Sequence, residues 1–209
     1  MLPAEVSGAK EEEDFRSLLR KVRDAGIEWV LTGNLGLAVM AGQEGMKVRG
    51  DMELTLTNEL ALESMAGVGF LSVTISPELT MQQIRRLPKN MDTEFIAYGR
   101  IPVMVTPNCL LKESAGRCTC TVPGQMADTH GSVWPVTRHF GCRNTVWAAR
   151  KIWMADKSEE WSDCGLWAIR LCVSTESPRE CLEVAKSYMQ GTSYHPNGMT
   201  RGTYYRALL

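Results

Sequence analysis

Short strand patterns alternate with short helix patterns through the first half of this chain. The helix expected at 10–25 is the clearest, because Phe15, Leu18, Leu19 and Val22 recur at helical spacing and form one apolar face. Strands are expected at 27–31, 45–49, 70–76 and 93–98, with helices between them at 35–41, 58–65 and 81–87. Connections this short favour parallel strands joined by helices. The pattern therefore predicts a parallel sheet covered by helices, either a barrel or an open sheet.

The alternation stops after Gly99. Residues 100–150 hold turn residues, β-like pieces at 103–106, 118–122 and 132–136, and four cysteines. A helix near 153–161 and a strand at 166–173 follow, and Ser177, Pro178 and Glu180 are typical of a capped helix start. We therefore expect a partial β/α barrel over 1–99, a β-rich cysteine-containing insertion over 100–150, and a last helix–strand–helix with a tail over 151–209.

Composition excludes several classes of protein. The chain has 209 residues, 44% of them apolar and 22% charged, with a net charge of −1, so neither a disordered chain nor a strongly basic one is expected. The sequence contains no apolar run of ~18 residues and no signal-peptide pattern, which predicts a cytoplasmic protein without a membrane span. In the cytoplasm its seven cysteines are expected to be thiols or metal ligands rather than a disulfide framework.

Polar side chains follow each of the four expected strands. They are Asn34, Asp51, Glu78 and Arg100. In a parallel α/β barrel the loops at that edge build the active site, so these residues are candidates for catalysis and substrate binding. The alternative is that they are ordinary turn and helix-cap residues, which favour Asn and Asp.

Four cysteines in the insertion form the second candidate group. Cys109, Cys118, Cys120 and Cys142 are spaced C-x8-C-x-C-x21-C, and four thiolates suit either Zn²⁺ or an iron–sulfur cluster. His130 and His139 lie nearby in the sequence as a further ligand or an acid–base group. Reduced cysteines packed in a β-rich lobe are the alternative.

Residues 129–155 carry basic side chains and no acid. Arg138, Arg143, Arg150 and Lys151 alternate there with three tryptophans, at 134, 147 and 153. Cations interleaved with aromatic rings suit nucleic-acid binding, and Arg143 and Arg150 are the candidate phosphate contacts. A surface lobe with core tryptophans explains the same pattern.

Several motifs in one order resemble a known family. They are Gly33-Asn34-Leu35-Gly36, Gly50-Asp51, the stretch 76–84 (SPELTMQQI), the stretch 94–106 (EFIAYGRIPVMVT), Gly116-Arg117-Cys118-Thr119-Cys120, Gly141-Cys142-Arg143-Asn144, Ala155-Asp156-Lys157 and Thr200-Arg201-Gly202. With these motifs the chain resembles the C-terminal part of the collagenase-like peptidases of unassigned catalytic type, peptidase family U32, in its long-chain branch.

The resemblance implies a fold, a cofactor and a substrate. It implies an α/β fold: a partial TIM-like (β/α) barrel made of the later strands, with an inserted β-rich, cysteine-containing lobe. Relatives that hydroxylate RNA bases without oxygen use cysteine-bound clusters, so Cys109, Cys118, Cys120 and Cys142 are implied ligands of a four-iron cluster, with Zn²⁺ as the alternative. Asp51, Glu78 and Arg100 would then line the catalytic mouth, and Asn34, Arg143 and Arg150 would bind the substrate, for which the resemblance suggests RNA.

The resemblance leaves two other functions open. A metal-dependent collagenase-like peptidase is the alternative enzyme. A non-catalytic or degenerate module is the third reading, because the family's polar positions are changed at Leu54-Thr55, Asn58-Glu59 and Ala148-Ala149. Five strands cannot close an eight-stranded barrel, so a complementing half-barrel chain or self-association is the expected partner.

Overall fold

The computed structural model describes residues 9–117, 122–139 and 142–206, and these form two compact units. The described residues of the first unit are 9–95, 159–169 and 202–206. Those of the second unit are 96–117, 122–139, 142–158 and 170–201. Strands β4 (Asp92–Gly99) and β10 (Ala168–Cys172) each run from one unit into the other.

The first unit is built on four adjacent strands. Strands β1 (Trp29–Thr32), β2 (Lys47–Gly50), β3 (Phe70–Thr74) and the start of β4 pair in parallel in that order. The helical elements of this part of the chain are α1 (Ala9–Asp24), α2 (Leu35–Gln43), the 3-10 turn η1 (Met52–Leu54), α3 (Glu59–Val68), α4 (Met81–Arg86) and α6 (Ser158–Ser162).

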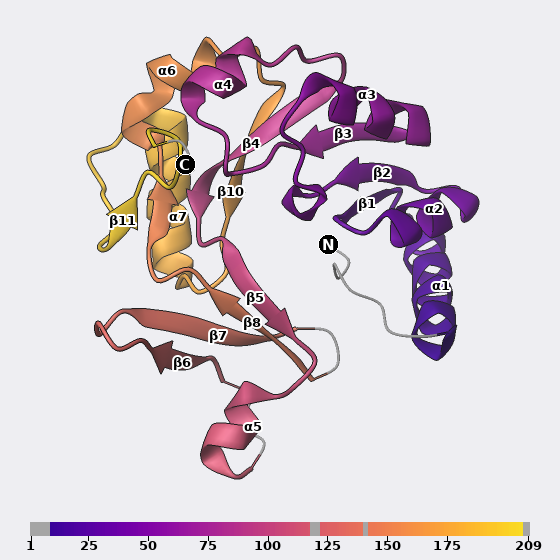
Figure 1. Ribbon diagram of the computed structural model, residues 1–209, viewed down its shortest axis with the longest axis horizontal. Helices are drawn as coiled ribbons and strands as arrows, with labels where there is room; N and C mark the ends of the chain where they lie inside the picture. The colour runs from indigo at the N-terminus through magenta and orange to yellow at the C-terminus, as the bar shows by residue number, and fades with distance from the viewer. Residues whose placement is uncertain (1–8, 118–121, 140–141, 207–209) are drawn as a thin grey trace. The chain divides into compact units, whose positions relative to one another are not determined.

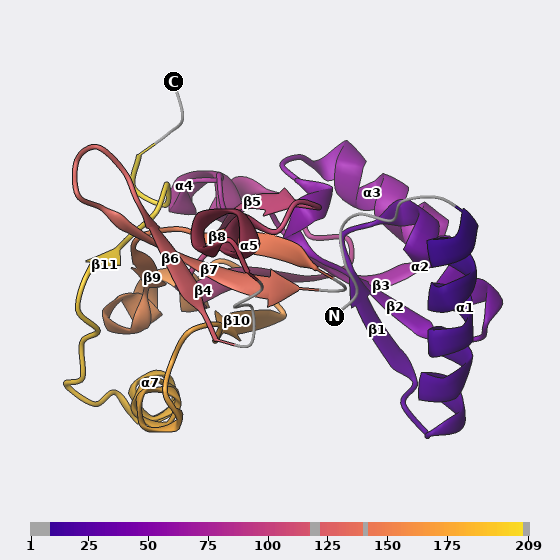
Figure 2. The same ribbon diagram turned by 90° about the horizontal axis from the view of Figure 1, so that it is seen from below.

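One face of this sheet is covered by helices. Right-handed crossovers between neighbouring parallel strands place their helices on the same side, and α2 and α3 lie together on one side of β1–β3 (Figure 2). Val30 and Val48 face these helices and are buried, whereas their strand neighbours Trp29 and Lys47 are exposed. The opposite face of the sheet is thus the one available for a site.

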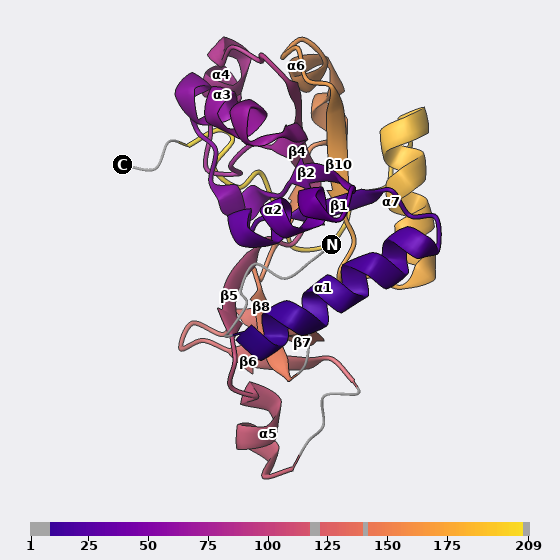
Figure 3. The ribbon, with the colours of Figure 1, turned by 90° about the vertical axis from the view of Figure 1, so that its right-hand side faces the viewer.

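Local sequence signals set the helix boundaries. Asn34 and Asn58 cap α2 and α3 through their side chains, and Thr80 and Gln83 form the expected capping box of α4. The long helix α1 lies beside α2, where Arg16 and Arg20 bind Glu44 at 3.2 and 3.1 Å (Figure 3).

The second unit contains a four-stranded antiparallel sheet. Its strands are β5 (Pro102–Thr106), β6 (Gly124–Ala127), β7 (Val133–His139) and β8 (Arg143–Trp147), in the order β5-β8-β7-β6. Helix α5 (Leu110–Ala115) follows β5 (Figure 1) and packs Leu111 against Val136 and Val146. The sheet therefore has a small apolar core of its own.

A second apolar cluster surrounds the end of β4. The remaining elements of this unit are β9 (Lys151–Trp153), the 3-10 turn η2 (Ala155–Lys157), α7 (Pro178–Gln190) and β11 (Met199–Thr200). Tyr98 and Trp153 are buried with Val184 of α7, and their rings meet edge to face at 5.9 Å. The Tyr188 hydroxyl donates to the Ala97 carbonyl at 2.5 Å and accepts from the Met154 N–H at 2.9 Å, which ties α7 to both strands.

The structure confirms some of the elements predicted from the sequence and corrects others. The alternating helices and parallel strands are confirmed, and Ser177 caps α7 in the expected capping box. A TIM-like barrel is not confirmed, because the described strands form no closed barrel and the parallel order ends where β4 pairs antiparallel with β9. The helix expected near 153–161 is wrong in its first half: Trp153 ends a buried strand, and the α-helix covers only Ser158–Ser162. The strand expected at 118–122 falls almost wholly outside the described residues.

No helix among the described residues is long and apolar enough to cross a membrane.

Candidate functional site

The predicted polar residues of the first unit follow its strands. Asn34 lies two residues after the end of β1, Asp51 comes directly after β2, and Glu78 lies in the turn between β3 and α4. The Asn34 Oδ1 accepts the Leu37 N–H at 2.9 Å, and the Asp51 Oδ1 accepts the Met52 N–H at 2.8 Å. Both therefore serve as helix caps, while the Glu78 side chain is exposed. Parallel strands bring these residues to one edge of the sheet.

The fourth of these predicted residues, Arg100, belongs to the second unit. Its Nη1 donates to the Ala148 carbonyl at 2.6 Å and its Nε to the Thr175 Oγ1 at 3.3 Å. These bonds join the end of β4 to two loops of the same unit. Arg100 thus holds these two loops against the end of β4.

A buried carboxylate in the first unit escaped the sequence analysis. Glu94 on β4 is 7% exposed and accepts the Thr74 hydroxyl at 2.8 Å, while the same hydroxyl lies 3.2 Å from the Gly50 carbonyl. Asp51, which follows Gly50, is 1% exposed. The sequence feature that could have identified Glu94 is its position inside the apolar strand expected at 93–98, because a buried charge is costly unless it is paired.

A stack of aromatic and cationic side chains in the first unit was also not predicted from the sequence. The Arg49 guanidinium carbon lies 4.4 Å from the Trp29 ring centroid and 4.8 Å from that of Trp167. The Lys47 Nζ lies 5.2 Å from the Trp29 ring. Trp29 and Trp167 are 41% and 46% exposed. The period-two pattern of 29–31 and 47–49 places three of these side chains on the helix-free face of the sheet.

In the second unit, strand register brings two predicted ligand cysteines to one end of the four-stranded sheet. Thr106 pairs with Asn144, so Cys109, three residues after Thr106, and Cys142, two residues before Asn144, lie beyond the same end of β5 and β8. The Leu111 N–H donates to the Asn144 Oδ1 at 3.4 Å, which holds the start of α5 at this end.

Strand β7 also reaches this end of the sheet. Gly124, the first residue of β6, pairs with Val136, and β7 continues from Val136 to His139, which lies opposite Arg143. Cys118 and Cys120 lie outside the described residues.

The donor groups at this end suit a soft metal or a cluster. The Cys109 side chain makes no capping hydrogen bond although it occupies the N-cap of α5, and Cys142 is exposed. Burial, aided by the positive charge of Arg143, lowers the pKa of His139, which keeps its imidazole neutral. Within 9–117, 122–139 and 142–206 no three His, Cys, Asp or Glu side chains are grouped as a metal site.

Most of the basic, tryptophan-rich stretch is engaged inside the second unit. Trp153 is 1% exposed, and the Trp147 Nε1 donates to the Thr137 Oγ1 at 2.8 Å. Lys151 pairs with Glu176 at 3.2 Å, and Arg143 is 8% exposed. Arg150 is exposed and free to meet solvent. The tryptophans of this stretch are thus largely core and hydrogen-bonding residues.

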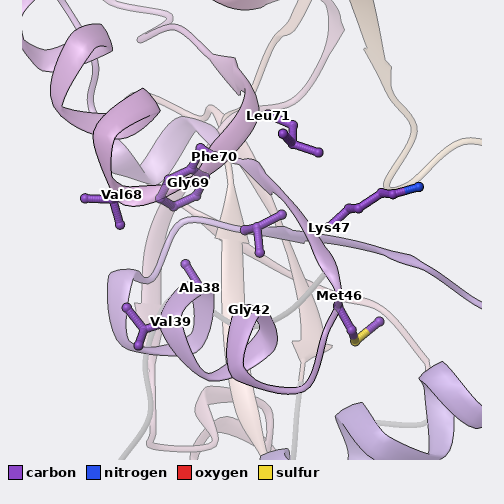
Figure 4. Close-up of a pocket in the computed structure, with 10 residues that line it drawn as sticks. Ala38, Val39, Gly42, Met46, Lys47, Val68, Gly69, Phe70 and Leu71 are labelled. Atoms are coloured by element: carbon purple, nitrogen blue, oxygen red, sulfur yellow. The ribbon is translucent and has the colours of Figure 1, made fainter.

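An apolar pocket of about 410 Å³ lies between α2 and α3 in the first unit (Figure 4). Val39 of α2 and Val68 of α3 line it, with Phe70 and Leu71 at the start of β3. It opens at the amino ends of the strands, away from the edge that carries Asn34 and Asp51. In an α/β sheet that end contributes to stability more often than to chemistry.

Comparison with known proteins gives a family assignment. No curated protein and no solved structure matches the chain. The family model described as Peptidase family U32 matches residues 6–129, which include the parallel strands, Asp51, Glu78, Arg100 and three of the four cysteines predicted as ligands. Because that match covers more than half of the sequence, the chain belongs to peptidase family U32.

Proposed function

We propose that this chain is part of an iron–sulfur-dependent, oxygen-independent RNA base hydroxylase. The observation that carries the proposal is the register of the four-stranded sheet, which puts Cys109 and Cys142 at one end of β5 and β8. Cys118 and Cys120 complete the ligand set in this proposal. Four thiols on one lobe are the donors that a four-iron cluster takes, and Zn²⁺ is the alternative occupant.

The bound cluster would supply one-electron chemistry, and the rest of the site belongs to the chain's own residues. Asp51 and Glu78, at the carboxyl edge of the parallel strands, would position the reacting base together with Asn34, and Arg100 would hold the loops of the second unit. Arg150 is exposed and suited to a phosphate contact, with Arg143 beside the cysteines.

The proposal includes a partner chain. Strand β1 pairs only with β2 among the described residues, so its other edge is open to a further strand. A complementing half-barrel chain or a second copy would supply that strand in the active assembly.

The test is an anaerobic purification with an absorption spectrum and assays of iron, sulfide and zinc. The cluster proposal predicts a brown protein with iron and sulfide at about four each per chain, the content of a four-iron cluster. The double variant Cys118→Ser, Cys120→Ser and the single variant Cys109→Ser are expected to lose both. Cys181→Ser, in α7 and half-buried, is the matched control and is expected to keep them.

The other outcomes identify the alternatives. Zinc held by the same cysteines, with chelator-sensitive cleavage of gelatin, would replace the hydroxylase by a collagenase-like peptidase. A colourless, metal-free protein would overturn the cluster and leave a non-catalytic module that binds a partner. A loaded cluster without any change in RNA would refute the substrate while retaining the cofactor.

A further inference from the structure

We propose that Trp29, Arg49 and Trp167 form a base-stacking subsite for single-stranded RNA on the helix-free face of the first unit. The inference deepens the proposed function, on which its choice of RNA rests, by naming where the substrate strand is held. It uses none of the cysteines and none of the basic residues of 129–155.

The three side chains converge from three segments of the first unit. Trp29 and Lys47 are direct register partners on β1 and β2, and Arg49 is two residues further along β2, so all three point to the same side. Trp167 is held at β4 by its N–H, which donates to the Thr93 carbonyl at 2.9 Å. Ser72, the register partner of Arg49 on β3, is small and buried, which leaves room for the arginine to reach across.

Arg49 lies against both indoles. A guanidinium over an aromatic face is attracted by the ring at about 0.5–2 kcal/mol, so the two contacts hold the rings in place before any ligand arrives. Each indole nevertheless keeps more than two-fifths of its surface open to solvent. Large aromatic side chains are ordinarily buried, and two held half-exposed beside one cation suit a planar ligand.

Arg49 is the cation of this place that can meet an anion. Its Nε is buried and has no hydrogen-bond partner among the described residues, so the arginine is not tied to an acid there. Lys47, in contrast, pairs with Glu28 at 2.8 Å, and Asp92 lies on the same face of the sheet as the register partner of Ser72. Stacking faces beside this guanidinium match a nucleotide, whose base stacks while its phosphate meets Arg49.

The experiment measures the binding of a fluorescein-labelled ten-nucleotide RNA to the full-length chain by anisotropy. Trp167→Ala and Trp29→Ala are each expected to weaken binding about tenfold, because stacking one base contributes about 1–3 kcal/mol. Arg49→Met is expected to weaken it and to flatten the salt dependence. Tyr205→Ala is the matched control, since Tyr205 is an aromatic residue of the same unit with 45% exposure, and binding should be unchanged.

Each possible result either supports or overturns the proposed stacking subsite. Equal weakening with poly-U and poly-A RNA, at unchanged melting temperature, supports a sequence-tolerant stacking site. If both tryptophan variants bind RNA with unchanged affinity, the subsite is overturned, even if the protein contains iron and sulfide. If the tryptophan variants of a cluster-free protein bind RNA more weakly, the subsite is supported, even if the hydroxylase proposal fails. Loss of gelatin-peptide binding with RNA binding intact would assign the site to protein and overturn the inference. If a tryptophan variant has a lowered melting temperature, Trp167→Phe is tested as well, because phenylalanine keeps a stacking face. This variant must restore the affinity for RNA, and failure to do so counts against the subsite.

Discussion

The Glu176 carboxylate has four partners within the second unit. Its carboxylate accepts the Ser174 and Thr175 N–H groups at 2.7 and 2.9 Å and the Tyr98 hydroxyl at 3.1 Å, and it pairs with Lys151 at 3.2 Å. Its side chain is fully buried. Burial by itself raises the pKa of Glu176, but the two backbone donors and Lys151 outweigh burial and leave the pKa below its ordinary value.

Replacing Glu176 by Gln is expected to lower the free energy of unfolding by about 1.5–3 kcal/mol at neutral pH, because the buried Lys151 loses one of its two carboxylate partners and keeps Glu180 at 3.2 Å. Urea unfolding measures this. Glu183→Gln, on α7 and in an exposed pair with Lys186 at 3.6 Å, should change stability by less than about 1 kcal/mol.

The same residue gives a pH dependence. A carboxyl whose pKa is lower in the folded state stabilises the fold above its unfolded value near 4.5, and the contribution is lost as the pH falls below that value. The wild-type protein should therefore lose stability more steeply than Glu176→Gln as the pH falls through this range. Parallel acid limbs in the two proteins would contradict this assignment.

At the scale of elements, the sequence was most informative where local signals act alone. The capping residues Thr80 and Ser177 set the starts of α4 and α7 as expected. The helix expected from residue 153 failed because Trp153 is needed in the core beside Tyr98, and tertiary burial overrides a local helical pattern. The Trp29–Arg49–Trp167 stack could not be predicted, since it joins segments more than 100 residues apart in the sequence.

Strands β4 and β10 meet so closely at Gly99 that only glycine fits. Gly99 has φ +119°, and a Cβ there would lie 2.0 Å from the Cys172 carbonyl oxygen. Gly99→Ala is expected to destabilise the protein by several kcal/mol, more than the ~1–3 kcal/mol of ordinary overpacking, because backbone must move. Gly67→Ala, inside α3 with nothing within 4 Å of the new Cβ, should instead stabilise by about 1 kcal/mol. Thermal melting of the pair measures the contrast, and similar melting temperatures would refute the close approach.

For the whole molecule, the sequence indicated the fold class, an α/β chain with a parallel sheet. The βα pattern of 27–99 identified the parallel sheet, whereas the return of 159–169 and 202–206 to the first unit has no local signature. Tyr204 shows what that return contributes. It is 1% exposed, its ring lies 5.4 Å from that of Phe95, and its carbonyl accepts the Met81 N–H at 2.9 Å.

Removing this ring should weaken the first unit from within. Tyr204→Ala is expected to cost about 3–5 kcal/mol, the usual loss for a large aromatic core residue. Hydrogen exchange should speed up at β3, β4 and α4 of the first unit. Tyr205→Ala, at the neighbouring exposed position, should leave exchange unchanged. Equal protection in both variants would show that Tyr204 is not part of that core.

The position of Tyr204 also matters during synthesis. A ribosome delivers Phe95 and Met81 more than a hundred residues before their partner Tyr204. Until that residue emerges, the nascent first unit presents an apolar surface that later becomes core, a surface that chaperones recognise. Completion of the first unit thus depends on translation of 202–206. A chain truncated before these residues would contain the parallel sheet but would leave exposed the apolar surface that Tyr204 covers.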